Sequence, residues 1–247
     1  MDNNELFYPQ ICADVSGYVF EEGIEIQVCS AKDSRSDWAK VRFTREFENE
    51  IQLMQGADAM IQMGYGGVLD EVFQGYVARS VTGGEVVLKD EMLVLESTEI
   101  CETFQDATPQ EIIRFILARC GITQMRLSEE GYPQRRLVPI AKQSATSAIE
   151  AVNAAWGLQI PFFFRSGVFH WGTVPEQEKI YAFEYGVNIL SLNRVGRTWE
   201  LETVSAPFVR HSQVIRVEHP QYQGEAEVLK VLFTTNDAGF IRTFIYF

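Results

Sequence analysis

Short segments in which apolar and polar residues alternate make up most of this chain, and glycines separate many of them. The clearest is Glu71–Val81, where the even positions from 72 to 78 and the odd positions from 73 to 79 would point to opposite sides. A period of two is typical of a half-buried strand, because successive side chains of a strand point to opposite faces. Gly66-Gly67 and Gly83-Gly84 provide backbone freedom for tight turns. In the first part of the chain the pattern predicts strands at Tyr8–Cys12, Gly23–Cys29, Trp38–Phe47, Ala59–Met63, Glu71–Val81, Glu85–Leu88 and Glu91–Leu95.

The pattern changes after Asp106, where a helix is predicted at Pro109–Cys120. Thr108 is suited to the N-cap, a proline follows at the first helical position, and Glu111 completes a capping box. Apolar residues recur at helical spacing through this segment, and a glycine follows its end. A short strand is predicted at Ile122–Leu127.

A second helix is predicted at Ser144–Trp156, with Gly157 just past its end. Two very apolar segments follow, Leu158–Arg165 and Val168–Trp171, and Ser166-Gly167 can form the turn between them. These residues predict a β-hairpin. Residues 107–175 are therefore expected to form a small α+β module.

The alternating pattern returns at Tyr181 and continues to the last residue. The last segment, Phe240–Phe247, is aromatic on both faces, so we expect it to be covered by its own barrel or by a neighbouring subunit. The fold class predicted is mainly β, with two small antiparallel β-barrel domains, residues 1–106 and 176–247, joined by an α+β insert, residues 107–175. The strands of the last block are predicted at Ile189–Val195, Trp199–Val204, Gln213–His219, Glu227–Thr235 and Phe240–Phe247.

The net charge of −13 comes almost entirely from the first block. Residues 1–106 hold 7 Lys+Arg against 21 Asp+Glu, whereas residues 107–175 hold 7 against 4 and residues 176–247 hold 7 against 9. Direct binding of nucleic acid by neutralising phosphates needs a basic face, so no such binding is expected. The acidic block can be a solubilising surface, a wall that repels a passing polyanion, or a face that meets a basic partner.

The chain carries no pattern typical of an enzyme, a cofactor site or a metal site. It has no GxSxG turn, no glycine-rich phosphate loop with its lysine and no CxxC pair. We therefore expect no catalytic, cofactor-binding or metal-binding residues, and we expect the adjacent carboxylates to be solvated turn charges. The residue types that could serve such a site are the cysteines and histidines, Cys12, Cys29, Cys101, Cys120, His170, His211 and His219, and the carboxylate groups Glu21-Glu22, Glu46/Glu48/Glu50, Asp70-Glu71, Asp90-Glu91 and Glu129-Glu130.

No run of 18 apolar residues occurs, so no membrane-spanning helix is expected. The first ten residues are polar and acidic, unlike a secretory signal peptide. We therefore expect synthesis in the cytoplasm without secretion by a signal peptide, and no membrane partner.

Several segments, taken in order, resemble the hub proteins of phage tails, the group that includes baseplate hub and late control D-like proteins of contractile tails and injection systems. The resemblance covers most of the chain and rests on the order of the segments more than on any one of them. They are Asp37–Phe43 (DWAKVRF), Gly56-Ala57-Asp58, Val72–Val77 (VFQGYV), Thr108–Ile122 (TPQEIIRFILARCGI), Trp156–Phe164 (WGLQIPFFF), Phe169–Gly172 (FHWG) and Phe183–Leu192 (FEYGVNILSL).

The resemblance implies two related barrels and a helix-containing insert, and a homotrimer whose six barrels form a ring with pseudo-sixfold symmetry. It implies a structural protein of the virion tail, or of a phage tail-like particle, that adapts the tail tube to the central spike. The partners implied are the tail tube protein and the spike protein, with a tape measure protein as a further candidate. The alternatives left open are a cell-wall-acting (peptidoglycan) enzyme or carbohydrate-binding module of a tail, and a general β-rich binding module.

Overall fold

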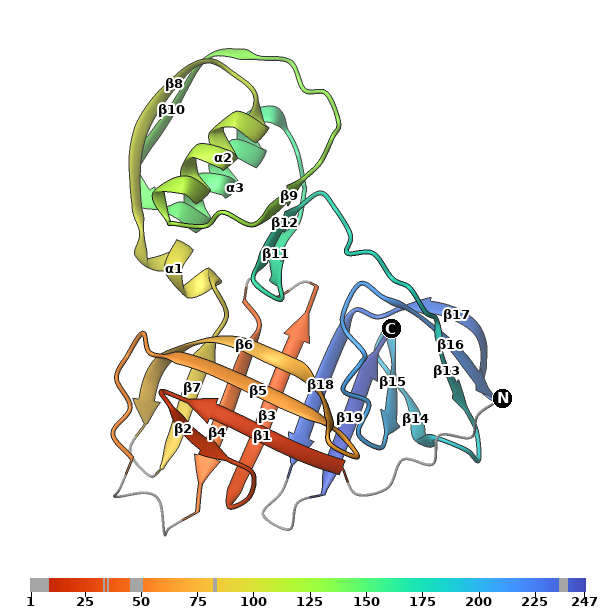
Figure 1. Ribbon diagram of the computed structural model, residues 1–247. Coiled ribbons are helices and arrows are strands. Elements are labelled where there is room, and N and C mark those ends of the chain that lie inside the picture. Colours follow the sequence, from red (N-terminus) through yellow and green to blue (C-terminus); the bar gives the residue numbers. More distant parts are fainter. Residues whose placement is uncertain (1–8, 33, 35, 45–50, 82–83, 236–239) are drawn as a thin grey trace. The chain divides into compact units, whose positions relative to one another are not determined.

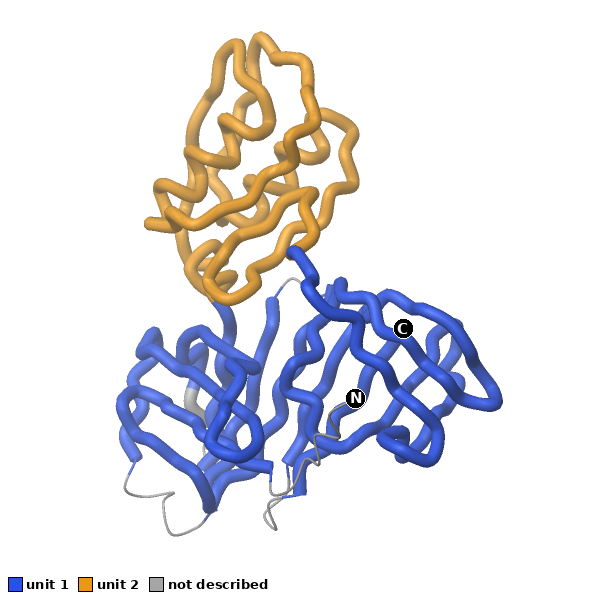
Figure 2. The backbone as a smooth tube through the Cα atoms, turned by 45° about the vertical axis from the view of Figure 1, so that its right-hand side comes forward, with its two compact units in different colours: residues 1–90, 176–247 blue, residues 91–175 orange. Residues whose placement is uncertain are grey.

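The computed structural model describes residues 9–32, 34, 36–44, 51–81, 84–235 and 240–247, which form two compact units (Figure 1). The strand unit contains residues 1–90 and 176–247, and the insert unit contains residues 91–175 (Figure 2). The chain thus leaves the strand unit once and returns to it once.

An 11-stranded sheet runs through the strand unit in the order β14-β15-β19-β18-β3-β4-β7-β6-β5-β1-β2. Every strand pair in it is antiparallel. Strands from both ends of the chain therefore share one sheet. Its strands are β1 (Pro9–Val15), β2 (Tyr18–Phe20), β3 (Ile24–Ala31), β4 (Trp38–Phe43), β5 (Asp58–Tyr65), β6 (Val68–Val81), β7 (Glu85–Lys89), β14 (Ile189–Val195), β15 (Thr198–Thr203), β18 (Lys230–Thr235) and β19 (Ile241–Tyr246).

A second, three-stranded sheet of the strand unit has the order β13-β16-β17. It consists of β13 (Tyr181–Glu184), β16 (Val214–His219) and β17 (Tyr222–Glu227). Residues of both sheets contribute to a single hydrophobic core, in which Val28, Val77, Phe233 and Val217 are fully buried. The strand unit is therefore built around one core that the first and last parts of the chain share.

Strand β6 pairs with β5 along its first part and with β7 along its last part. Gly75 lies where the partners change. A Cβ atom on Gly75 would lie 2.1 Å from the Lys89 carbonyl oxygen, closer than any side chain can approach. The absence of a side chain at position 75 thus lets β6 pass close to the end of β7.

The insert unit contains the three helices of the described residues: α1 (Met92–Ser97), α2 (Pro109–Arg119) and α3 (Ala145–Trp156). Its core is separate and contains Ile113, Leu117 and Trp171, all fully buried. The Asn153 side chain links α3 to the core, because its Oδ1 accepts from Trp171 Nε1 at 2.9 Å. The strands form two sheets, β8 (Glu99–Ala107) with β10 (Arg135–Ser144), and β11 (Phe162–Arg165), β12 (Val168–Trp171) and β9 (Met125–Leu127).

Both long helices begin where the sequence predicts. Thr108 and Glu111 form the expected capping box, with the Glu111 carboxylate accepting from the Thr108 backbone N–H at 2.8 Å. Ser144 caps α3, and Gly157 ends it in the left-handed conformation with φ of 70°. The hairpin on Ser166-Gly167 is confirmed as β11 and β12. The prediction of a mainly β fold with a helix-containing insert is therefore confirmed.

Some local predictions are wrong or incomplete. Residues 91–95 are predicted as a strand, but Glu91 is the N-cap of helix α1 and residues 92–95 belong to that helix, which buries Met92 and Leu95 on the same face. Strands β8, β10 and β17 were not predicted; most of their residues are exposed, so the strands lack the regularly buried face that gives a clear apolar–polar alternation. Tyr8 and residues 45–47 of predicted strands lie outside the described residues. Residues 91–106 lie in the insert unit, and the three-part division at 106 and 175 stays a prediction.

Candidate assembly surface

The same four-strand arrangement occurs twice within the large sheet. In the order of the sheet, the last block reads β14-β15-β19-β18 and the first block reads β3-β4-β7-β6. If the four strands of each block are numbered along the chain, both blocks have the spatial order first, second, fourth, third. Each block therefore consists of two hairpins joined in the same way, β14–β15 with β18–β19 and β3–β4 with β6–β7.

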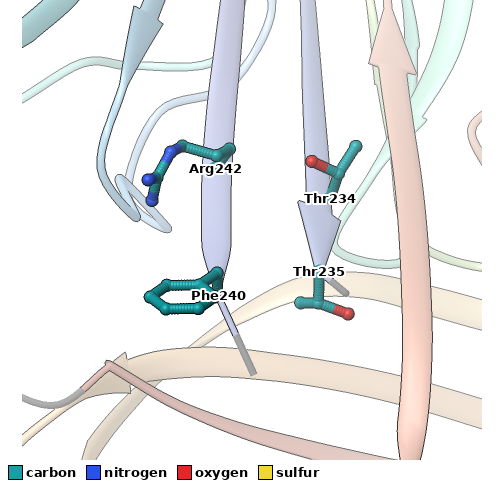
Figure 3. A pocket seen from close by; sticks show the side chains of 4 residues that line it. All are labelled: Thr234, Thr235, Phe240 and Arg242. Carbon is teal, nitrogen blue, oxygen red and sulfur yellow. The ribbon is translucent and has the colours of Figure 1, made fainter. Parts of the chain in front are cut away.

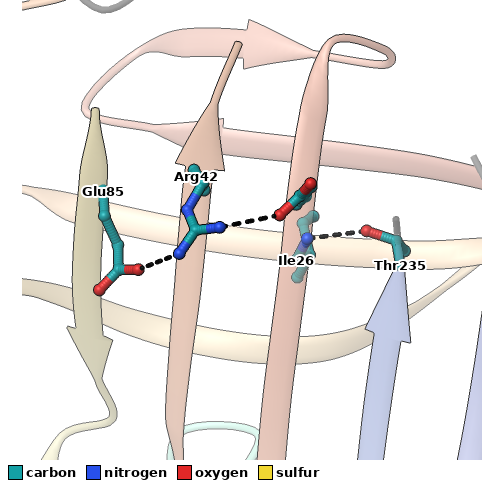
Figure 4. A network of polar contacts seen from close by, with 5 residues as sticks. Ile26, Arg42, Glu85 and Thr235 are labelled. Atoms are coloured by element: carbon teal, nitrogen blue, oxygen red, sulfur yellow. Dashed lines mark hydrogen bonds and ion pairs between the residues drawn. The ribbon is translucent and has the colours of Figure 1, made fainter. Parts of the chain in front are cut away.

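The two blocks are joined edge to edge by strands β18 and β3. Five cross-strand pairs form this joint, from Lys230 opposite Ala31 to Thr234 opposite Gln27. At the end of the joint the Ile26 backbone N–H donates to the Thr235 side-chain oxygen at 2.7 Å (Figure 4). The third strand of one block thus pairs with the first strand of the next, which is a head-to-tail contact rather than a symmetric one.

The two strands that would continue this pattern have open edges. Strand β14 pairs with β15 on one side, and among the described residues its other side has only an isolated bridge between Ile189 and Tyr185. On β6, the β5 pairing ends at Tyr76, and backbone hydrogen bonds to residues 56 and 57 end at Val77. Of the remaining residues, 79–81 pair with β7 only, and the register shift between Val77 and Arg79 leaves Ala78 with no β7 partner, within the part of the chain that the structure describes. An unpaired strand edge is a template for another strand.

A half-buried arginine ties the last block to the first. Arg210, in the loop between β15 and β16, donates through its guanidinium to the backbone carbonyls of Pro207, Val209 and Glu71, and the last of these lies on β6. Burial lowers the pKa of Arg210, and the carboxylates of Asp70, Asp37 and Glu71 oppose that shift. Its guanidinium also lies over the Phe233 ring, 5.8 Å from the centroid.

The face of the sheet opposite the core carries rows of opposite charges. Arg42 on β4 forms ion pairs with Glu25 on β3 and Glu85 on β7, both at 3.3 Å (Figure 4). Such exposed pairs contribute about 1 kcal/mol or less each, so we assign them a role in strand register rather than in stability.

On the β15–β19 side of this face, burial and a hydrogen bond to Glu200 raise the pKa of Tyr246 to about 12. The ammonium group of Lys230, which is opposite Tyr246 on β18, lies 4.8 Å from the centroid of the tyrosine ring. The tyrosine thus contacts both a cation and a carboxylate on this face.

One open pocket of about 300 Å³ lies at the end of the β18–β19 hairpin, lined by Thr234, Thr235, Phe240 and Arg242 (Figure 3). The Phe240 side chain is 61% exposed. The Thr235 hydroxyl in this pocket accepts the Ile26 hydrogen bond described above. Among the described residues, the lining therefore combines a structural hydroxyl, an aromatic ring and a guanidinium.

The histidines occupy separate positions. His170 in β12 is buried, stacks on Phe163 and lies 3.0 Å from the Thr173 hydroxyl. Burial is the largest cause that lowers the pKa of His170. His211 is fully buried with its Nδ1 2.9 Å from the Ser212 hydroxyl, and His219 lies at the end of β16. Within the described ranges, no three His, Cys, Asp or Glu side chains are arranged to hold a metal ion.

The adjacent carboxylates include one buried exception to the sequence prediction. Asp90, expected to be a solvated turn charge, is only 5% exposed and accepts from the Ser36 hydroxyl at 2.8 Å. It also accepts from the Asp37 backbone N–H at 3.0 Å, so it holds the loop before β4 against the end of β7. Glu21-Glu22 and Glu129-Glu130 are exposed as predicted, whereas residues 46–50 lie outside the described residues.

The last strand, which the sequence predicts to need a cover, is covered by other strands of the same chain. Strand β19 is flanked by β15 and β18, and Ile241, Thr243 and Ile245 are buried in the core. It is therefore an interior strand and not a free edge for a neighbouring subunit. None of the four cysteines forms a disulfide. In the described part of the chain no helix is both long enough and apolar enough to cross a membrane.

No protein-family model matches this sequence, and no curated protein matches it. Several solved structures share its fold. The 43 kDa tail protein of prophage MuSo2 from Shewanella oneidensis has a TM-score of 0.73 at 12% identity, over 97% of this chain and 98% of that one. A tail protein from Neisseria meningitidis MC58 has a TM-score of 0.73 at 9% identity, over 97% of this chain and 96% of that one.

A third structure is the E. coli c3393 protein, described as a component of the type VI secretion system with structural similarity to the T4 bacteriophage tail proteins gp27 and gp5. Its TM-score is 0.65 at 13% identity, over 91% of this chain and 73% of that one. The chain therefore has the fold of phage tail proteins, and the predicted resemblance is confirmed at the level of the fold.

Proposed function

We propose that this protein is a structural hub of a phage tail or phage tail-like particle, in which three copies form a ring that adapts the tail tube to the central spike. It acts by shape and symmetry and carries out no reaction. Its proposed partners are further copies of itself, the tail tube protein, the spike protein and a tape measure protein. Direct contact with nucleic acid or with a membrane is not part of the proposal.

The observation that carries this proposal is the repeated strand block. Two blocks with the same strand order lie head to tail in one sheet, so each chain offers two similar positions to its surroundings. Three chains would offer six similar positions around one axis. A ring built this way can meet a sixfold tube with its repeated blocks and a threefold spike with features that occur once per chain.

The features that occur once per chain support the same division of roles. The insert unit, residues 91–175, follows β7, the fourth strand of the first block, and each chain has one such unit among these residues. A ring of three chains would therefore carry three inserts and six strand blocks. The fold shared with phage tail proteins supports the proposal.

Two experiments test the proposal. Negative-stain images of the purified protein should show a ring with a central hole, a threefold outline and six similar inner lobes. Co-expression with the tube and spike proteins of the same tail should recover both on the tagged hub. Particles without a ring, together with failure to retain either partner, would contradict the proposal. Peptidoglycan hydrolysis that is lost on substitution of a carboxylate would contradict the non-enzymatic role.

A further inference from the structure

We propose that neighbouring copies join by pairing β14 of one chain with residues 78–81 of β6 in the next chain, in the geometry of the internal β3–β18 joint. This inference rests on the proposed ring and identifies the contact that would close it. The internal joint pairs the third strand of the last block with the first strand of the first block. The equivalent strands left with open edges are the third strand of the first block, β6, and the first strand of the last block, β14.

The register follows from equivalent positions in the two blocks. Lys89 and Tyr246 each end the fourth strand of a block, and they face Trp38 and Glu200 on the second strand. On the first strand of each block, Cys29 faces Trp38 and Asn193 faces Glu200. Cys29 and Asn193 are therefore equivalent positions, on β3 and β14 respectively.

The third strand is matched in the same way. Two residues before the ends of the fourth strands, Val87 faces Arg79 on β6 and Phe244 faces Leu232 on β18. Arg79 and Leu232 are thus equivalent. Since Cys29 faces Leu232 in the internal joint, Asn193 of one copy should face Arg79 of the next copy.

The hydrogen-bonding directions agree with this register. Trp199 and Phe247 exchange two backbone hydrogen bonds, so Trp199 directs its backbone groups to β19 and its neighbour Glu200 directs them to β14. Asn193, opposite Glu200, then bonds inward to β15, and Arg194 directs its N–H and C=O outward to the open edge. On β3, the residues that direct their backbone N–H and C=O groups towards β18 have even numbers. The Ile26 N–H, for example, donates to the Thr235 side-chain oxygen on the β18 side.

The side chains at the two edges suit a contact that forms on assembly. Arg79, Asn193, Arg194 and Val195 are all exposed, whereas the internal joint is apolar, with Val28, Val231 and Phe233 fully buried. A polar edge keeps a single chain soluble and discourages random strand pairing. A head-to-tail contact closes into a ring when its rotation divides a full turn, and here the occupant of each edge is a second copy of this chain.

A disulfide test follows from the pairing of positions 193 and 79. Because Asn193 bonds inward, the proposed 193–79 pair is of the non-hydrogen-bonded type, in which opposing side chains lie close enough for a disulfide. The background for every variant is Cys101→Ser, since Cys101 is an exposed native thiol. Mild oxidation of Asn193→Cys/Arg79→Cys should give covalently linked dimers and trimers.

The single variants and Asn193→Cys/Lys40→Cys are the controls, since Lys40 is exposed on the interior strand β4. They should give at least tenfold less cross-linked product. A native trimer whose 193/79 variant does not cross-link above these controls would overturn this joint and leave the proposed ring standing. A protein that stays monomeric in solution when the tube and spike proteins are added would overturn both.

A second pair of variants tests the outward N–H directly. Arg194→Pro removes this donor, and proline is tolerated on an edge strand where the N–H points outward. Arg194→Ala removes the same side chain and keeps the N–H. We expect Arg194→Pro to weaken self-association at least about tenfold with an unchanged melting temperature, and Arg194→Ala to associate like the parent. Equal association of the two variants would overturn the joint.

Discussion

Val28 on β3 and Phe233 on β18 face each other across the strand joint, and both side chains are fully buried. These residues come from opposite ends of the chain, yet they pack in the same core. The strand unit therefore cannot be divided at the joint without exposing this core. The same contact that closes the folded chain is also the template for the proposed contact between chains.

The first prediction concerns the stability of this joint. Phe233→Ala should lower the free energy of unfolding of the strand unit by about 3–5 kcal/mol, because it removes a large buried side chain and leaves a cavity. Leu232→Ala, at a half-buried neighbouring position, should cost distinctly less. Urea unfolding followed by intrinsic fluorescence measures both. Separate unfolding transitions for residues 1–90 and 176–247 would contradict the shared core.

The second prediction concerns the guanidinium that ties the loop before β16 to β6. Arg210→Met should destabilise the strand unit by about 2–3 kcal/mol, because the carbonyls of Glu71, Pro207 and Val209 lose a charged donor. Arg197→Met, at an exposed turn position, is the matched control and should change stability by less than about 0.5 kcal/mol. Thermal melts of the two variants give the comparison. Equal melting temperatures would show that the Arg210 hydrogen bonds contribute nothing to stability.

The third prediction concerns the capping box of α2. The Thr108 backbone hydrogen bond, followed by the Thr108 hydroxyl, lowers the pKa of Glu111 from 4.5. A pKa that is lowered on folding gives stability that is present above pH 4.5 and is lost as the pH falls through the lowered value. The melting temperature of the parent should therefore exceed that of Glu111→Gln at pH 7, and the difference should shrink towards zero in acid. A difference that is constant with pH would exclude the carboxylate charge as its cause.

The fourth prediction concerns the tyrosine on the open face of the sheet. Burial first, and then the Glu200 hydrogen bond and charge, raise the pKa of Tyr246 from 10 to about 12. A raised pKa gives stability that is fully present below pH 10 and is lost as the pH rises from 10 to about 12. Tyr246→Phe should accordingly show a shallower loss of stability over this range. If parent and variant lose stability in parallel in alkaline urea titrations, the prediction fails.

The sequence predicted the elements whose signals are local. The α2 capping box at Thr108 and Glu111, the glycine after α3 and the hairpin turn at Ser166-Gly167 depend on residues within a few positions of one another. Strand β4 and the first half of β3 were predicted because apolar residues on their buried face alternate with polar residues on the other face. Polar strands such as β8 and β17 lack that alternation, and the two apolar residues Met92 and Leu95 suit a short helix as well as a strand.

The candidate assembly surface could not be predicted because it depends on which strands become neighbours. Phe240–Phe247 has the composition expected of a strand that needs a partner, but the fold supplies both partners from within the chain, β15 and β18. The open edge is instead β14, whose exposed Asn193 and Arg194 give no apolar signal. The strand order that the two blocks share, and the β3–β18 pairing that joins them, become visible only in the folded sheet.

The most direct test of the proposed function is the mass of the purified protein in solution, measured by light scattering at micromolar concentration. The proposed ring predicts the mass of three chains, three times 28.1 kDa, because the head-to-tail contact between strand blocks should close after three copies. A single mass of 28.1 kDa that does not change when the tube and spike proteins are added would contradict the ring and, with it, the proposed hub.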